Sequence, residues 1–138
     1  MKAIVQLEFD GRCREAFEFY ARALGGEIKV MNALGETKDV PLPPGSRPAG
    51  AESIRFAQLA IGDTLIQGND LPPGEYRPKQ GFNVALHVRD KAEAHRVFGA
   101  LADGGRVETP LSEVAWSSAF GMLKDRFGTP WLILSMDE

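Results

Sequence analysis

Apolar and polar residues follow the same order in two separate parts of the chain. Residues 3–9 alternate and are rich in β-forming side chains, which predicts a strand. Residues 14–24 carry apolar side chains at helical spacing, which predicts an amphipathic helix lying on a sheet. The same pattern returns at residues 82–88 and 90–102, and each helix is followed by a Gly-Gly pair, where glycine accepts the left-handed conformation that ends a helix. The chain is therefore predicted to contain two similar modules.

Three further strands are predicted in each half: residues 27–32, 52–61 and 64–68 in the first, and residues 106–110, 116–124 and 130–136 in the second. The order strand-helix-strand-strand-strand, or βαβββ, thus occurs twice. Residues 34–50 are punctuated by Pro and Gly and are predicted to form a long exposed loop that gates a ligand site or crosses to a partner subunit. We predict one domain over residues 1–138, with module one at about 1–68, a connector at about 69–81 and module two at about 82–138.

The composition fits one compact, soluble domain. With 138 residues, 43% of them hydrophobic, the chain can bury a core, and its single cysteine, Cys13, excludes an internal disulfide. The net charge is −3 and the basic residues are scattered, so no nucleic-acid partner is expected. No apolar run reaches about 18 residues and the N-terminus carries charges, so neither a membrane span nor a signal peptide is expected. These features predict a cytoplasmic protein.

Short motifs spread over both modules carry a resemblance to a known family. They are Phe9-Asp10-Gly11-Arg12-Cys13-Arg14-Glu15-Ala16, Phe19-Tyr20, Gly25-Gly26, Ala60-Ile61-Gly62-Asp63, Gly81-Phe82, Trp116, Phe120-Gly121-Met122 and Asp125-Arg126-Phe127-Gly128-Thr129-Pro130-Trp131. In this order and spacing the chain resembles the vicinal oxygen chelate (VOC) superfamily, with the glyoxalase/bleomycin resistance fold, and within it the PhnB-like branch. The resemblance covers nearly the whole chain. It implies an α+β fold in which two βαβββ modules form a cup-shaped mixed β-sheet with helices on the outside, usually within a homodimer.

Metal-using members of that superfamily hold a divalent ion with four inward-facing side chains, one each from the first and fourth strands of both modules. Imidazole and carboxylate ligands suit this role because they leave coordination positions open for substrate oxygens. Alignment on the helix and turn motifs places other residue types there: Ile4, either Ile66 or Gln67, Asn83 and Leu132. A register shift of one residue gives Val5 or Gln6, Gln67, Asn83 and Ile133. We therefore expect no metal and no other cofactor, with a divalent metal as the alternative.

Strand periodicity predicts which side chains line the cup. If Leu7 and Phe9 face their helix, residues of the opposite parity face the cup, and the same holds for residues 82–88. The predicted substrate-binding residues are Gln6, Glu8, Gln67, Asn83, His87 and Trp116, the last as a flat apolar wall. Glu8 and His87 are also candidate catalytic residues, because a carboxylate and an imidazole close together can act as a base and its partner.

Each candidate also has a structural interpretation. His87 is then a hydrogen-bonded structural histidine and Glu8 a solvated residue at the sheet rim. In the same interpretation Gln6 and Asn83 bond only each other. We expect Trp131 in the core, Cys13 as a small residue that fits before a helix, and the segment 125–128 as a turn with an exposed charge pair.

Two classes of function remain open. The first is a metal-free module that binds a small organic ligand in the cup. The alternative is an enzyme of the same fold, of the lyase, isomerase, dioxygenase or resistance type, which uses a metal or the Glu8 and His87 side chains. Proteins of this branch are sometimes labelled as ubiquinone methyltransferase relatives, but no strand here leads into a Gly-rich turn that would hold S-adenosylmethionine. Whether the chain is an enzyme is thus left open.

Overall fold

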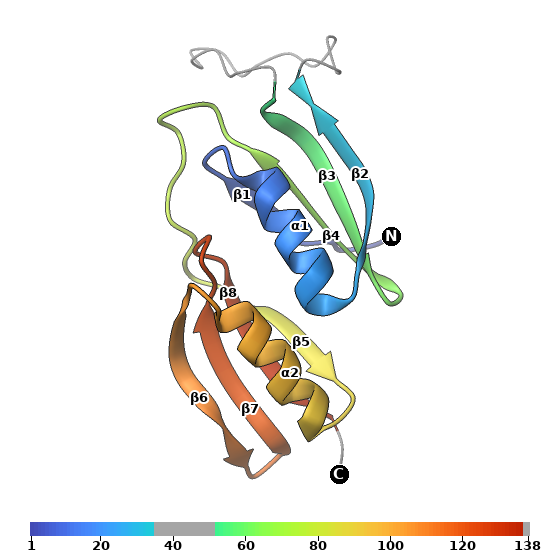
Figure 1. Ribbon diagram of the computed structural model, residues 1–138, viewed down its shortest axis with the longest axis vertical. Helices are drawn as coiled ribbons and strands as arrows, with labels where there is room; N and C mark the ends of the chain where they lie inside the picture. The colour runs from blue at the N-terminus through green and yellow to red at the C-terminus, as the bar shows by residue number, and fades with distance from the viewer. Residues whose placement is uncertain (35–51, 137–138) are drawn as a thin grey trace. The chain divides into compact units, whose positions relative to one another are not determined.

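The computed structural model describes residues 1–34 and 52–136, which belong to two compact units, Met1–Arg77 and Pro78–Glu138. Each unit contains one helix and a four-stranded sheet (Figure 1). The loop predicted at residues 34–50 lies, apart from Leu34, outside the described residues. No helix in the described part of the chain has the length and apolar character needed to cross a membrane.

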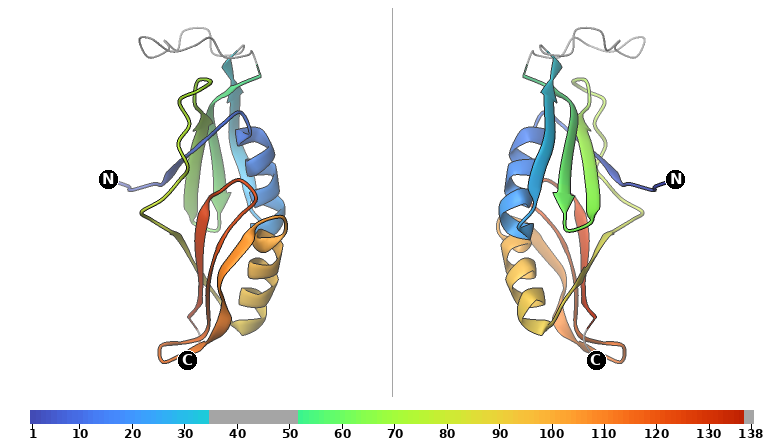
Figure 2. Two further views of the ribbon diagram at one scale, coloured as in Figure 1. Left: turned by 90° about the vertical axis from the view of Figure 1, so that its left-hand side faces the viewer. Right: turned by 90° about the vertical axis from the view of Figure 1, so that its right-hand side faces the viewer.

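The first unit consists of β1 (Gln6–Phe9), α1 (Cys13–Leu24), β2 (Glu27–Ala33), β3 (Ile54–Ile61) and β4 (Thr64–Asp70). Its sheet has the order β1-β4-β3-β2, in which β1 and β4 are parallel and the other neighbours are antiparallel. The helix α1 lies on one face of this sheet (Figure 2). We call the opposite face of the sheet the open face.

The second unit repeats this plan with β5 (Val84–Val88), α2 (Lys91–Ala102), β6 (Arg106–Val114), β7 (Ser117–Lys124) and β8 (Pro130–Ser135). Its sheet has the order β5-β8-β7-β6, again with a parallel first pair, and α2 lies on one face (Figure 2). Every predicted strand and helix is present, so the α+β class and the twofold βαβββ order are confirmed. The closure of the two sheets into a cup stays a prediction.

Two strands continue by two or more residues past their predicted ends, and β2 continues by one, to Ala33. The strand β4 runs to Asp70 instead of Gly68, and β6 runs to Val114 instead of Pro110. A proline inside β6 is tolerated because β6 ends its sheet and because its register with β7 is irregular between Thr109 and Ser112. The strand β1, in contrast, begins at Gln6, three residues later than predicted.

The core of the first unit forms where α1 meets the sheet. Leu7 and Phe9 are buried, at 1% and 2% exposure, and alternate with exposed neighbours along β1. The ring of Phe9 lies 6.1 Å from that of Phe17 and 6.5 Å from that of Tyr20, both on the buried stripe of α1. Aromatic rings at these separations stabilise each other beyond the area that they bury. The predicted orientation of Leu7 and Phe9 toward the helix is confirmed.

The two glycines of each Gly-Gly pair have different roles. The first glycine of each pair has a positive φ, 67° at Gly25 and 77° at Gly104, which other residues rarely adopt. The second glycine provides room for the sheet. A Cβ atom at Gly26 would lie 2.7 Å from the carbonyl oxygen of Ala60, and one at Gly105 would collide with the carbonyl oxygen of Lys124. The prediction of a helix stop therefore explains only the first glycine of each pair.

A buried carboxylate joins three elements of the first unit. Asp70, the last residue of β4, is 2% exposed and accepts hydrogen bonds from the backbone N–H groups of Cys13 and Ile54, each at 2.9 Å. It thereby satisfies the first N–H of α1 and ties the start of β3 to the end of β4. Cys13 itself is fully buried, in agreement with the prediction of a residue that fits.

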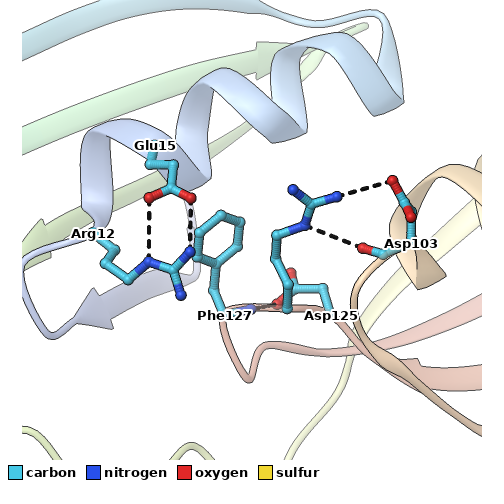
Figure 3. Close-up of polar contacts among 6 residues, drawn as sticks. Arg12, Glu15, Asp103, Asp125 and Phe127 are labelled. Atoms are coloured by element: carbon cyan, nitrogen blue, oxygen red, sulfur yellow. Dashed lines mark hydrogen bonds and ion pairs between the residues drawn. The ribbon is translucent and has the colours of Figure 1, made fainter.

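A second buried carboxylate organises the connection between β7 and β8. Asp125 is 4% exposed and accepts hydrogen bonds from the backbone N–H groups of Phe127 and Thr129 and from the indole N–H of Trp131. The predicted exposed charge pair is wrong for Asp125, because these donors hold its carboxylate inside. Arg126 pairs instead with Asp103 at 3.0 Å (Figure 3).

Candidate functional site

A row of glutamines crosses the open face of the first sheet. In the strand register Gln6 of β1 pairs with Gln67 of β4, and Gln67 pairs with Gln58 of β3. Directly paired residues of neighbouring strands point to the same face, and Gln6 is exposed where its neighbour Leu7 is buried. The three glutamines therefore lie side by side on the face away from α1.

Two of these glutamines form a chain of hydrogen bonds that ends at Asn69. The amide nitrogen of Gln67 donates to the Oε1 atom of Gln6 at 2.6 Å, and the amide nitrogen of Gln6 donates to the Oδ1 atom of Asn69 at 2.7 Å. Asn69 in turn donates to the backbone oxygen of Asp70 at 3.3 Å. Because Gln6 both accepts and donates, the orientation of its amide is set by its neighbours. We call Gln67, Gln6 and Asn69 the carboxamide chain.

Asn69 was missed by the sequence reasoning, which ended this strand at Gly68 and placed Asn69 in the connector. The spacing of Leu65, Gln67 and Asn69 at every second position indicates a strand that continues to Asn69. The residues Gly-Asn-Asp, however, are typical of a turn. The segment stays extended because β1 pairs with it up to Asp70 and because the Asp70 carboxylate is bonded inside the unit. Glu8 pairs with Asn69 in the same ladder, so its exposed carboxylate lies beside the carboxamide chain.

The second sheet has the opposite chemistry on its open face. His87 pairs with Leu134, which pairs with Phe120, and the next row contains Ala85, Leu132 and Met122. His87 and Ala85 are exposed, while the leucines, Phe120 and Met122 are half-buried. This face is therefore mainly apolar, with one imidazole on the edge strand β5.

Register allows the two open faces to be compared position by position. The last parallel pair is Phe9 with Asp70 in the first unit and Val88 with Ser135 in the second. Counting back from these pairs makes four positions equivalent: Gln6 with Ala85, Glu8 with His87, Gln67 with Leu132, and Asn69 with Leu134. The repeated backbone thus carries hydrogen-bonding side chains in one copy and mostly apolar side chains in the other.

The remaining predicted residues lie in the second unit. Asn83 immediately precedes β5 and is exposed, and Trp116 lies between β6 and β7 with 69% of its surface exposed. Trp131 is fully buried, so its assignment to the core is confirmed. Gln6 bonds to Gln67 and Asn69 in its own unit, and the acid-base pairing of Glu8 with His87 stays a prediction.

The residues at the superfamily's metal positions do not suit a metal ion. Ile66 is 4% exposed and faces the buried side of β4, so the register selects Gln67 for the open face. Its equivalent, Leu132, has no donor atom, and the same offset makes Ile4 the equivalent of Asn83. No group of three His, Cys, Asp or Glu side chains among residues 1–34 and 52–136 could hold a metal ion.

The turn that leads from β1 into α1 does not suit S-adenosylmethionine. Open α/β sheets that bind nucleotide cofactors use a glycine-rich turn after a strand so that the backbone can approach the cofactor closely. Here Gly11 is the one glycine between β1 and α1, and the first N–H of the helix, that of Cys13, already donates to Asp70. This turn therefore offers no backbone cradle for such a cofactor.

The two βαβββ units define the glyoxalase/bleomycin resistance class of proteins, and solved structures from that superfamily have the same fold. The family model described as "3-demethylubiquinone-9 3-methyltransferase" matches residues 1–134, and the chain belongs to this family, which is PhnB-like. Protein YjdN of Escherichia coli (strain K12) is 31% identical over 132 residues, which cover 92% of this chain and 90% of YjdN.

Two of the similar solved structures match almost the whole chain. Protein PA1353 from Pseudomonas aeruginosa is 36% identical with a TM-score of 0.87, and the match covers 100% of this chain and 99% of that one. The PhnB protein from Bacillus cereus, described as a putative 3-demethylubiquinone-9 3-methyltransferase, is 20% identical with a TM-score of 0.79, covering 98% and 99% of the two chains. The second of these supports the fold alone.

Proposed function

We propose that this protein binds a small organic ligand on the open face of its first sheet and holds no metal ion there. The carboxamide chain carries the proposal, because three amides from β1 and β4 are oriented by one another before a ligand arrives. Polar groups that are already held in place bind a ligand with a smaller loss of conformational entropy than mobile ones. A few oriented polar groups are what gives small-molecule sites their specificity.

The hydrogen-bond donors and acceptors that these amides leave unused indicate the kind of ligand. Among the described residues, the Oε1 atom of Gln67 and the side chain of Gln58 take part in no hydrogen bond. Gln67 can therefore accept a bond from a ligand, and the second amide hydrogens of Gln6 and Gln67 can donate one. The carboxylate of Glu8, which lies beside the carboxamide chain, would repel an anion. We infer a neutral or donor-rich organic molecule.

Substitutions that copy the second unit give a direct test. Gln67→Leu and Gln6→Ala install the side chains that the same backbone positions carry in the second sheet, Leu132 and Ala85. A library of neutral and charged organic fragments would be screened by NMR for shifts of the Gln6 and Gln67 side-chain amides. Each variant loses one or two hydrogen bonds to the ligand. Its affinity for the fragments found in the screen should therefore fall by about tenfold.

Gln80→Leu is the matched control, because Gln80 is exposed and lies outside both sheets. It should leave fragment binding unchanged. The proposal fails if no fragment moves the two amide resonances, or if Gln67→Leu binds the same fragments as tightly as the unmodified protein does.

The metal-free part of the proposal has its own test. Elemental analysis of the purified protein should find far less than one nickel, zinc, manganese or iron ion per chain. Turnover of the methylglyoxal hemithioacetal should not depend on added nickel or zinc. A stoichiometric metal, or metal-dependent turnover, would contradict the proposal and favour the enzyme alternative.

We also propose that the protein is a cytoplasmic homodimer. Support for a dimer comes from β2 and β6, each of which ends its sheet, because strands at a sheet edge favour pairing with another chain. The half-buried apolar side chains of Phe120, Leu132 and Leu134 add to this support, because soluble proteins tend to cover such faces. Sedimentation of dilute protein should give twice the chain mass, and a monomer at all concentrations would exclude the dimer.

A further inference from the structure

A cavity of about 480 Å³ lies in the second unit, where β6 turns into β7. It is lined by the consecutive hairpin residues from Glu113 to Ser118 and by Met136, which follows β8. Its volume falls in the range of sites that hold small organic molecules, roughly 300–1,000 Å³. All of its lining residues belong to the second unit, so the cavity is separate from the carboxamide chain.

The most exposed aromatic side chain of the described residues lines this cavity. Trp116 is 69% exposed, and its neighbour in the lining, Met136, is 58% exposed. The ring of Phe120 lies 5.9 Å from the indole of Trp116 at an angle of 75°, so the indole is supported by a second ring while much of its surface stays open. A tryptophan held in this way presents the electron-rich surface that attracts cations most strongly among side chains.

The polar groups of the lining favour a cation. Ser117 and Ser118 are hydrogen-bonded to Ser135, at 2.8 Å to its backbone oxygen and at 2.7 Å to its hydroxyl, so their hydroxyls are engaged within the protein. Glu113 is the one charged residue in the described lining and forms no ion pair there. The cavity thus combines an indole surface, a thioether and a carboxylate without a compensating positive charge.

We propose that this cavity binds a small organic cation that carries a planar aromatic ring. The ring stacks on Trp116 beside Met136, and the positive charge is attracted by both the indole and the carboxylate of Glu113. This inference does not depend on the proposed function, because no residue of the first sheet takes part in it.

A pair of nearly identical probes separates charge from shape. N-methylphenanthridinium is a planar cation, and phenanthridine is its neutral relative at pH 7.5. Calorimetric titration of the full chain should show one cation bound per chain, about tenfold more tightly than phenanthridine, as expected for cation–π attraction with help from a carboxylate. A planar anion, naphthalene-1-sulfonate, should bind more weakly than either.

The variants assign the effect to residues. Trp116→Ala should lower the affinity for the cation by about tenfold, and Trp116→Phe should lower it by less, since phenylalanine retains a ring. Glu113→Gln should reduce the preference for the cation over phenanthridine severalfold. Trp116 is exposed, so these variants are expected to fold, and the buried Trp131 provides a fluorescence signal that checks this. Gln67→Leu should leave cation binding unchanged, which separates this site from the first sheet.

Three outcomes would overturn the proposal. The first is equal affinity for the cation and phenanthridine, or no cation binding at all. The second is unchanged binding in Trp116→Ala. The third is loss of cation binding in Gln67→Leu, because the cation would then occupy the carboxamide chain.

Discussion

The carboxylate of Asp125 accepts a hydrogen bond from the indole nitrogen of Trp131 at 2.8 Å, across the tight connection between β7 and β8. The other carboxylate oxygen accepts from the N–H groups of Phe127 and Thr129 at 2.8 and 3.0 Å. One buried side chain therefore holds both the turn and the largest side chain of the core in place. This arrangement explains why an acidic residue is buried directly after β7.

Replacing Asp125 by alanine should strongly destabilise the protein. The substitution leaves three buried N–H donors without their acceptor, and each such donor costs about 1–3 kcal/mol. We expect the free energy of unfolding to fall by about 3 kcal/mol or more, measured by urea titration. Asp103→Ala is the control, since its side chain is 78% exposed and its ion pair with Arg126 should contribute about 1 kcal/mol or less. If the two variants lowered the free energy of unfolding equally, the buried hydrogen bonds of Asp125 would not be a major source of stability.

Replacing Asp70 by alanine should loosen the junction of α1, β3 and β4. Asp70 accepts from the N–H groups of Cys13 and Ile54, so both amides should exchange their hydrogens with solvent faster in the variant. Amides in the second unit, such as that of Trp131, serve as the internal reference in the same spectrum. We expect a loss of stability of about 2 kcal/mol. Unchanged exchange at Cys13 would mean that another group satisfies the first turn of α1.

The second glycine of each Gly-Gly pair should not tolerate alanine. A methyl group at Gly26 would press on the carbonyl oxygen of Ala60, so Gly26→Ala should lower the free energy of unfolding by about 1–3 kcal/mol. Gly99 lies inside α2 with no atom within 4 Å of an added Cβ, so Gly99→Ala should raise stability by about 0.5–1 kcal/mol. Thermal unfolding of the two variants should therefore shift in opposite directions. Shifts of the same sign would refute this explanation.

The thiol of Cys13 should be protected in the folded protein. Cys13 is 0% exposed at the start of α1, so a thiol reagent such as Ellman's reagent should react only when the unit opens. The reaction should be slow in buffer and fast in urea above the unfolding midpoint. Asp70→Ala should accelerate it in buffer, because the bond to the Cys13 backbone is then lost. Rapid reaction of the native protein would show that Cys13 is accessible.

The predicted site could be read only in part from the sequence. Alternation placed Gln6 and Glu8 on the face opposite Leu7 and Phe9, and the structure agrees because side chains of a strand must alternate. Asn69 was assigned to the connector, since Gly68 followed by two turn-forming residues gives no local sign of a strand. Its place next to Gln6 depends on pairing with β1, more than sixty positions earlier in the chain.

Local patterns along the chain predict the order of strands and helices, the duplication and the buried stripe of each helix, because these features depend on periodicity within a few neighbouring residues. The roles of the polar residues, in contrast, depend on contacts between parts of the chain that are distant in sequence. Asp70 and Asp125 became buried acceptors because backbone donors from distant or sharply turned segments converge on them. Likewise, the register of parallel strands brought the amides of Gln67, Gln6 and Asn69 within hydrogen-bonding distance, and no local pattern encodes which strands will be neighbours.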